Sequence, residues 1–202
     1  MFDDIDTQVN SNGSFTLSLA SQVLCDKSEY FEHINNLIAQ QTIYPSGRSV
    51  RTDIFYESFF ISLFAYLESM TGQVCDDLAI ILHKKIRLHD LNERSKFEGT
   101  RKYLGLLTDS EFPTKQIFGE VITYRKIRNT IAHGNSLLDI KEKDERAIQK
   151  LPGIRRNEEG YLEMTSEFCT GFLKFCHEYI KEFKLVSDEI ATRAKRKVTL
   201  VT

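Results

Sequence analysis

The sequence predicts an all-α protein, an antiparallel bundle of about five to seven helices with a small β-hairpin-like excursion near residues 154–164. Hydrophobic residues make up 41% of the 202 residues and only three residues are proline, a composition typical of a globular helical chain. Apolar residues recur at helical intervals along most of the chain. The polar segments between these patterns are short, which favours antiparallel packing of neighbouring helices.

The first half of the chain gives three helical patterns. We expect residues 1–14, which are polar, to form a flexible N-terminus. Apolar residues from Phe15 to about Gln41 then predict a helix, either continuous or interrupted by a break. A turn at Tyr44–Gly47 precedes a long core helix over residues 49–70, which we expect Thr71 and Gly72 to end. A further helix is predicted over residues 74–87.

The second half continues in the same way. We expect helices over residues 92–107 and, capped by Thr114, from there to His133, followed by a short surface helix within 138–150. Residues 154–164 place polar turn residues between two apolar edges and predict the hairpin. The last helix begins after Thr165 and runs to about residue 194, so residues 15–194 form a single predicted domain before a basic tail, 195–202.

Composition and charge exclude several classes of protein. The net charge of −2 gives no overall nucleic-acid signature, so bound RNA would need a local basic surface. The four cysteines show no C-x-x-C spacing, and the acidic start does not match a signal peptide, which predicts a cytoplasmic protein with reduced thiols and no metal or cofactor. The apolar stretch Ile54–Leu67 is too short to cross a bilayer, so no membrane association is expected.

One segment, Arg128-Asn129-Thr130-Ile131-Ala132-His133-Gly134, combines an arginine, an amide and an imidazole at the end of a predicted helix. Asn129 and His133 are four residues apart and share a helical face, with Arg128 beside it. His133 can exchange a proton near neutral pH, and the guanidinium of Arg128 can hold a phosphate oxygen. This pairing suits attack of a ribose 2′-hydroxyl on the adjacent phosphate, which needs no metal.

The same segment can also be explained by a purely structural role. An arginine followed five residues later by a histidine occurs by chance in roughly one chain in five of this length. Gly134 is well placed as the left-handed residue after the last turn. His133 would then be only a favourable cation near a helix C-terminus.

The string Arg128-Asn129 followed by His133 resembles the signature of the HEPN superfamily of all-helical ribonucleases. The resemblance implies a helical core with the motif late in the chain, and a metal-independent endoribonuclease of bacterial defence, toxin or RNA-processing type. It also implies a homodimer in which two motifs face one another. The position two residues after His133, a modified tyrosine in one branch of the superfamily, is Asn135 here, which makes that form of control improbable.

Other residues are candidates to support this site. Glu68 follows the apolar core helix, and a pairing with Arg128 would orient the guanidinium. HEPN proteins often carry an acidic or polar residue at a similar place in the helix opposite their motif, so the resemblance gives this role to Glu68, which can instead be a solvated glutamate in the last turn of its helix. Glu57 is a second candidate on the same helical face. Arg125 and Lys126 are candidate RNA contacts. Further cations can extend a phosphate-binding surface or form an ordinary solvated face, because acidic residues interleave with them: Lys84, Lys85, Arg87, Arg94, Lys96, Arg101 and Lys102.

We therefore expect RNA as the substrate, with no specificity for DNA, and a regulatory or antitoxin protein as a further partner. The alternative function is a noncatalytic HEPN-like dimerisation or nucleotide-binding module that uses the same arginines to hold an anion.

Overall fold

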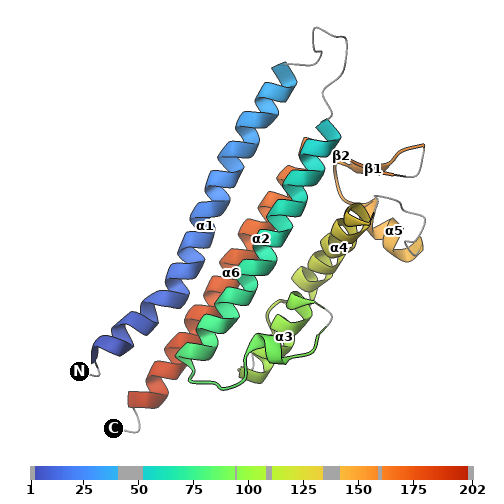
Figure 1. The fold of residues 1–202 in the computed structure, drawn as a ribbon. Coiled ribbons are helices and arrows are strands. Elements are labelled where there is room, and N and C mark those ends of the chain that lie inside the picture. The colour runs from blue at the N-terminus through green and yellow to red at the C-terminus, as the bar shows by residue number, and fades with distance from the viewer. Residues whose placement is uncertain are drawn as a thin grey trace. The chain divides into compact units, whose positions relative to one another are not determined.

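The computed structural model describes residues 3–40, 52–93, 95–107, 111–133, 142–158 and 161–199, and it confirms an all-α bundle with a small antiparallel hairpin (Figure 1). The elements follow in chain order: α1 (Asp3–Gln40), α2 (Thr52–Ile81), the 3-10 helix η1 (Leu88–Asp90), α3 (Lys96–Leu107), α4 (Lys115–Ala132), α5 (Glu142–Ile148), β1 (Ile154–Arg156), β2 (Leu162–Met164) and α6 (Ser166–Thr199).

The chain forms two compact units, and four helices contribute to both. Unit 1 contains Met1–Val23, Tyr66–Phe118 and His177–Thr202. Unit 2 contains Leu24–Ala65 and Gly119–Cys176.

Aromatic side chains fill the core of unit 2. The Tyr124 ring of α4 lies 4.6 Å from Phe172 and 4.9 Å from Phe175 of α6, between ring centroids. Phe60 of α2 lies 4.8 Å from Phe172 in an edge-on arrangement. Since such contacts add to the free energy gained by apolar burial, they fix α2, α4 and α6 against one another within this unit.

Unit 1 has its own aromatic core. Phe112 stacks on Phe183 at 4.9 Å and lies 5.2 Å from Tyr179, while Phe97 of α3 meets Tyr179 edge-on at 5.8 Å. Tyr179 is completely buried, and this burial raises the pKa of its hydroxyl well above the ordinary value.

Helix α2 continues through Thr71 and Gly72, so the predicted helix end at this point is wrong. Thr71 is fully buried, and its hydroxyl donates to the carbonyl of Leu67 at 2.7 Å and contacts the Tyr179 hydroxyl at 3.3 Å. Packing of this side chain in unit 1 therefore outweighs the low helix propensity of the Thr-Gly pair, which is about 1 kcal/mol for the glycine.

The end of α2 lies at Ile81, and the separate helix predicted over residues 74–87 does not exist. His83 adopts the left-handed conformation with φ of 51°. Its N–H donates to the Ile80 carbonyl at 3.0 Å, and the N–H of Lys84 donates to the Ala79 carbonyl at 2.8 Å. This is the hydrogen-bond pattern of a Schellman cap, made here by a histidine in the place usually taken by glycine.

Other boundaries differ from the predicted ones by smaller amounts. Helix α1 begins at Asp3, within the segment expected to precede the first helix, and continues without a break. Helix α3 begins at Lys96, after the 3-10 turn, and α6 extends to Thr199, beyond its predicted end. The predicted basic tail therefore has a helical backbone as far as Thr199.

The predicted hairpin is present and is fixed to the start of α6. Ile154 pairs with Met164 in an antiparallel register. The N–H and the hydroxyl of Thr165 both donate to the Gly153 carbonyl, at 2.8 and 3.1 Å. Gly153 has φ of 73°, and a Cβ there would lie 2.3 Å from the Phe168 nitrogen, so this position requires glycine.

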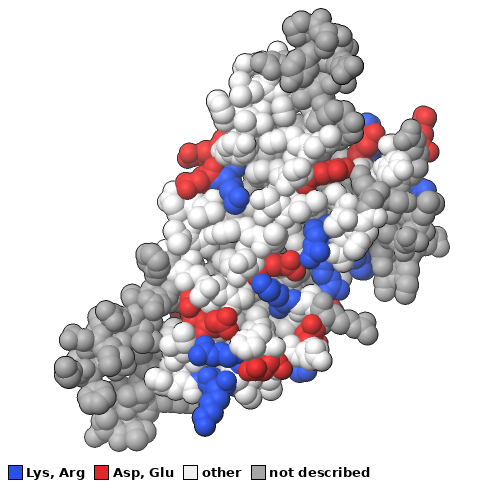
Figure 2. All heavy atoms as spheres, in the orientation of Figure 1, with Lys and Arg blue, Asp and Glu red and all other residues white. Residues whose placement is uncertain are grey.

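Among the described helices, none combines the length and the hydrophobicity that a membrane span needs. Acidic and basic side chains are interspersed on the face drawn in Figure 2, rather than separated by sign.

Candidate functional site

Helix α4 carries the Arg-Asn-x3-His motif on its last turns. As predicted, Thr114 caps its start, with its hydroxyl accepting from the N–H of Ile117 at 3.4 Å and its carbonyl accepting from that of Phe118 at 2.9 Å. The helix ends at Ala132, and the N–H of His133 still donates to the Asn129 carbonyl at 3.0 Å. Thus His133 completes the last turn. Gly134, the predicted left-handed residue, lies outside the described residues.

The guanidinium of Arg128 lies over an aromatic ring of α2, within unit 2. Its Cζ is 5.4 Å from the centroid of the Phe64 ring, and Phe64 is 1% exposed. Arg128 itself is half-buried. A cation at this distance over an aromatic ring is attracted by the negative face of the ring, and a guanidinium can recognise a phosphate or carboxylate through the donors in its plane.

Asn129 and His133 lie on a different side of α4 from Arg128. Successive residues of a helix differ by about 100°, whereas residues four apart differ by about 40°. Asn129 is half-buried and His133 is exposed. The structure therefore places the amide and the imidazole together towards solvent, with the arginine beside them turned to the aromatic core.

The two predicted RNA contacts lie one turn before the motif. Arg125 and Lys126 are half-buried, and the Lys126 carbonyl accepts a hydrogen bond from the Thr130 hydroxyl at 3.0 Å. With Arg128 they put three cationic side chains within four residues of α4. This run of the sequence is basic although the net charge of the chain is −2.

Glu68 and Glu57, the two acidic candidates, are both half-buried residues of α2. Glu57 belongs to unit 2 together with Arg128, while Glu68 belongs to unit 1. The pairing of Glu68 with Arg128 stays a prediction. The ring that does contact Arg128, Phe64, stands one helical turn before Glu68 on the same side of α2.

Several of the other predicted phosphate-binding cations have structural partners in unit 1. Lys102 pairs with Glu93 at 2.7 Å, and the Arg101 guanidinium lies 4.9 Å from the Phe118 ring centroid. Arg87 donates to the Asp76 carbonyl at 3.0 Å. Lys84 and Lys85 are exposed, and the side chain of Arg94 lies outside the described residues. This set is therefore divided between structural contacts and a solvated surface.

The cysteines form no disulfides. Burial raises the pKa of the Cys75 and Cys169 thiols from 9.0 to about 12, and it also raises that of Cys176 well above its ordinary value. Cys25 is exposed. The described residues contain no group of three or more His, Cys, Asp or Glu side chains that could hold a metal ion.

Two features were missed by the sequence reasoning. One is Phe64, and the other is a cleft along α2 lined by Ser69, Gly72, Gln73 and Asp76. These four residues fall at positions i, i+3, i+4 and i+7, which is the spacing of one helical face. The predicted helix end at Gly72 hid this pattern, because it divided the four residues between two helices.

Comparison of the chain with protein-family models, with curated proteins and with solved structures finds no match.

Proposed function

We propose that this protein is a metal-independent endoribonuclease of HEPN type that cleaves RNA by attack of a 2′-hydroxyl on the adjacent phosphate. The observation that supports it best is the arrangement at the end of α4. An exposed imidazole, that of His133, follows a half-buried arginine whose guanidinium rests on Phe64. A proton acceptor open to substrate and an oriented cation are the two groups that this reaction needs.

In the proposed reaction His133 takes the proton of the 2′-hydroxyl, and the oxygen attacks phosphorus as the bond to the 5′-oxygen breaks. Arg128 stabilises the negative charge that develops on the phosphate oxygens. Asn129 positions the ribose or phosphate beside His133, and Arg125 and Lys126 hold neighbouring phosphates of the strand. The products are a 2′,3′-cyclic phosphate and a 5′-hydroxyl.

The active form in this proposal is a homodimer. The departing 5′-oxygen needs a proton from a general acid while the 2′-hydroxyl needs a base, and a single His133 supplies one of them. A second copy supplies the other. In one chain His133 is exposed, and a covering subunit would also exclude the water that screens charge at an open site.

Cleavage of a labelled single-stranded RNA by the purified protein tests the proposal. We expect His133→Ala to lower the cleavage rate by about a hundredfold or more, with unchanged far-ultraviolet circular dichroism. His33→Ala is the matched control, because His33 is an exposed histidine of α1 that the proposed reaction does not use. Failure of the wild-type protein to cut both structured and unstructured RNA would contradict the enzyme.

Mixing the wild-type chain with an inactive variant tests the shared site. A mixed dimer of wild-type and His133→Ala chains contains a single imidazole, so it lacks either the base or the acid of the proposed reaction. We expect an excess of the variant, unfolded and refolded together with the wild type, to lower the cleavage rate per wild-type chain well below that of the wild type alone. An unchanged rate per wild-type chain, with mixed dimers demonstrated by tagged subunits, would contradict the composite site.

The biological setting that the resemblance implies is bacterial defence or a toxin, acting in the cytoplasm under the control of a regulatory or antitoxin protein. The second candidate function is a noncatalytic module that binds an anion or RNA. The stacked guanidinium of Arg128 favours it, since a cation held on a ring can bind phosphate without any proton transfer. Binding of RNA that depends on Arg128 but not on His133, without cleavage, would select this alternative.

A further inference from the structure

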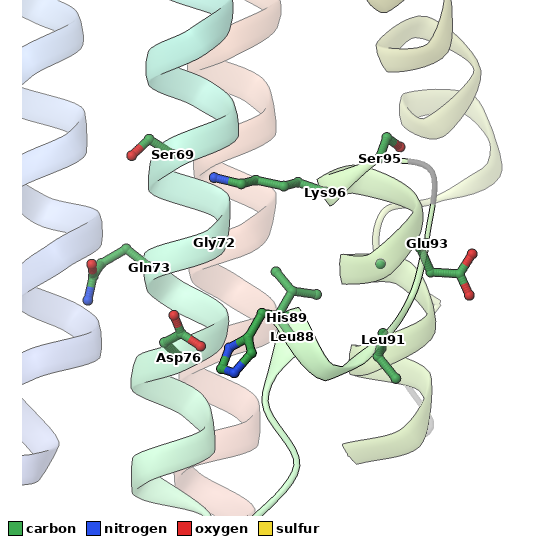
Figure 3. A pocket seen from close by; sticks show the side chains of 11 residues that line it. Ser69, Gly72, Gln73, Asp76, Leu88, His89, Leu91, Glu93, Ser95 and Lys96 are labelled. Atoms are coloured by element: carbon green, nitrogen blue, oxygen red, sulfur yellow. The ribbon is translucent and has the colours of Figure 1, made fainter.

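A cleft in unit 1 is separate from the α4 motif. It lies between α2 and the segment that leads from η1 into the start of α3 (Figure 3). Its volume is about 440 Å³, within the range of small-molecule sites. Besides the four residues of α2 named above, its lining includes Leu88, His89, Leu91, Glu93 and Lys96.

Gly72 and Lys96 shape one part of this cleft. A Cβ built on Gly72 would lie 3.7 Å from Lys96 Nζ and 3.8 Å from its Cδ, so the lysine chain passes directly over the glycine. Figure 3 shows the Lys96 side chain extending from α3 towards α2, at the level of Ser69 and Gly72. Lys96 is an exposed residue, and its ammonium group lies at the wall of the cleft.

Asp76 lies one helical turn further along α2 and has an unsatisfied oxygen. Its Oδ1 is buried and accepts no hydrogen bond in the part of the chain that the structure describes. The contact from Arg87 goes to the backbone carbonyl of Asp76 and not to the carboxylate. Leaving a buried carboxylate oxygen without a donor is unfavourable, and a cation bound beside the carboxylate would offset part of that cost.

The charged side chains that line the cleft determine which charges a ligand must carry. Glu93 is paired with Lys102 at 2.7 Å, and the imidazole of His89 lies 3.5 Å from the Asp90 carboxylate, which leaves Lys96 and Asp76 as an opposite pair lining the space. Gly72, beneath the Lys96 ammonium, and Asp76 are four residues apart, or about 6 Å along the helix axis. A ligand complementary to both must carry a negative and a positive group close together.

We propose that this cleft binds a free amino acid. The α-carboxylate would accept from Lys96 Nζ, the α-ammonium would donate to the Asp76 carboxylate, and the side chain would contact Leu88 and Leu91. A nucleotide or inorganic phosphate fits less well, because it brings two negative charges towards Asp76 and no cation to pair with it. The site goes beyond the proposed RNA cleavage and depends neither on His133 nor on Arg128.

Isothermal titration calorimetry of the full chain with leucine, methionine and phenylalanine tests this site. Two derivatives of leucine each remove one charge: leucine amide lacks the carboxylate and N-acetylleucine lacks the ammonium. We expect at least one amino acid to bind, and for leucine as the reference ligand each derivative should bind about tenfold or more weakly, the usual effect of losing a charge-assisted hydrogen bond.

Two variants assign the groups. Lys96→Met should weaken leucine binding about tenfold but leave binding of leucine amide unchanged. Asp76→Asn should weaken leucine binding about tenfold but leave binding of N-acetylleucine unchanged. Lys102→Met is the matched control, since this lysine of α3 pairs with Glu93 and does not line the cleft. The comparison of ligands needs no variant, so it remains decisive if Asp76→Asn fails to fold.

Three results would overturn the proposal. They are no heat of binding for any of the three amino acids at millimolar concentration, equal binding of leucine and both of its derivatives, and tighter binding of inorganic phosphate or a nucleoside monophosphate than of any amino acid.

Discussion

The guanidinium carbon of Arg128 lies 5.4 Å from the centroid of the Phe64 ring. One residue belongs to the proposed catalytic motif, and the other is a fully packed residue of α2 that is 1% exposed. The position of the cation is therefore set by the aromatic core of unit 2. A side chain with many rotamers becomes oriented before any substrate arrives.

The Arg128–Phe64 contact predicts a measurable coupling in stability. We expect Phe64→Leu and Arg128→Met to be non-additive by about 0.5–1 kcal/mol in the free energy of unfolding, measured by urea titration of both single variants and the double variant. A cycle of Phe64→Leu with Arg155→Met should be additive, because Arg155 pairs with Glu163 at 2.8 Å. Additivity within experimental error in both cycles would show that the ring does not hold the guanidinium.

Cleavage should be independent of divalent ions. The proposed reaction uses an imidazole and a guanidinium, and neither group needs a metal to act. We therefore expect the same cleavage rate with and without excess EDTA, measured on the same RNA substrate. Activity that disappears with EDTA and returns with Mg²⁺ or Mn²⁺ would be inconsistent with this chemistry.

His83→Gly should stabilise the protein. His83 has φ of 51°, a conformation that costs a residue with a Cβ about 1–2 kcal/mol and costs glycine little. Part of this gain is lost to the greater freedom of glycine in the unfolded chain, so we expect a net rise of about 0.5–1 kcal/mol in the free energy of unfolding. His33→Gly, within α1, should instead lower it by a similar amount. Destabilisation by both changes would contradict the cap at His83.

Stability should fall in alkaline solution because of the buried thiols. Cys75 and Cys169 have a folded-state pKa of about 12, against an ordinary value of 9.0. Above that ordinary value the unfolded chain loses these protons while the folded chain keeps them. Stability is thus complete below about pH 9 and is lost as pH rises towards 12, by about 1.4 kcal/mol per pH unit for each thiol.

Urea titrations under reducing conditions between about pH 8 and pH 10 measure this slope. Cys169→Ala should reduce the pH dependence, and Cys25→Ala, at the exposed cysteine, is the matched control. A slope that is the same in all three proteins would assign the loss of stability to other groups.

The sequence predicted the helices best where local signals and packing agree. Thr114 caps α4 as predicted, and the polar turn between Ile154 and Met164 forms the predicted hairpin. At Thr71 and Gly72 the local sequence and the packing disagree. The Thr-Gly pair favours a helix end, but Thr71 is buried against Tyr179, more than a hundred residues away in the chain. No local pattern contains that contact. The actual end depends on a left-handed histidine, which sequence propensities do not favour.

For the candidate site, too, the sequence predicted some features and not others. The positions of Asn129 and His133 follow from helical spacing alone, and the structure agrees with them. The contact of Arg128 with the Phe64 ring depends on how α4 packs against α2, and no local pattern in the sequence predicts it. Charge complementarity was visible in the sequence, whereas the orientation of two helices was not.

The distribution of the cysteines makes the native chain suitable for spectroscopy. Three thiols are buried and hard to ionise, while Cys25 is exposed on α1. A maleimide dye or a nitroxide should therefore attach at one position without any engineered substitution. In a homodimer the two labels would give a single inter-subunit distance, so pulsed electron resonance or energy transfer could observe assembly in the presence of RNA or of an amino acid.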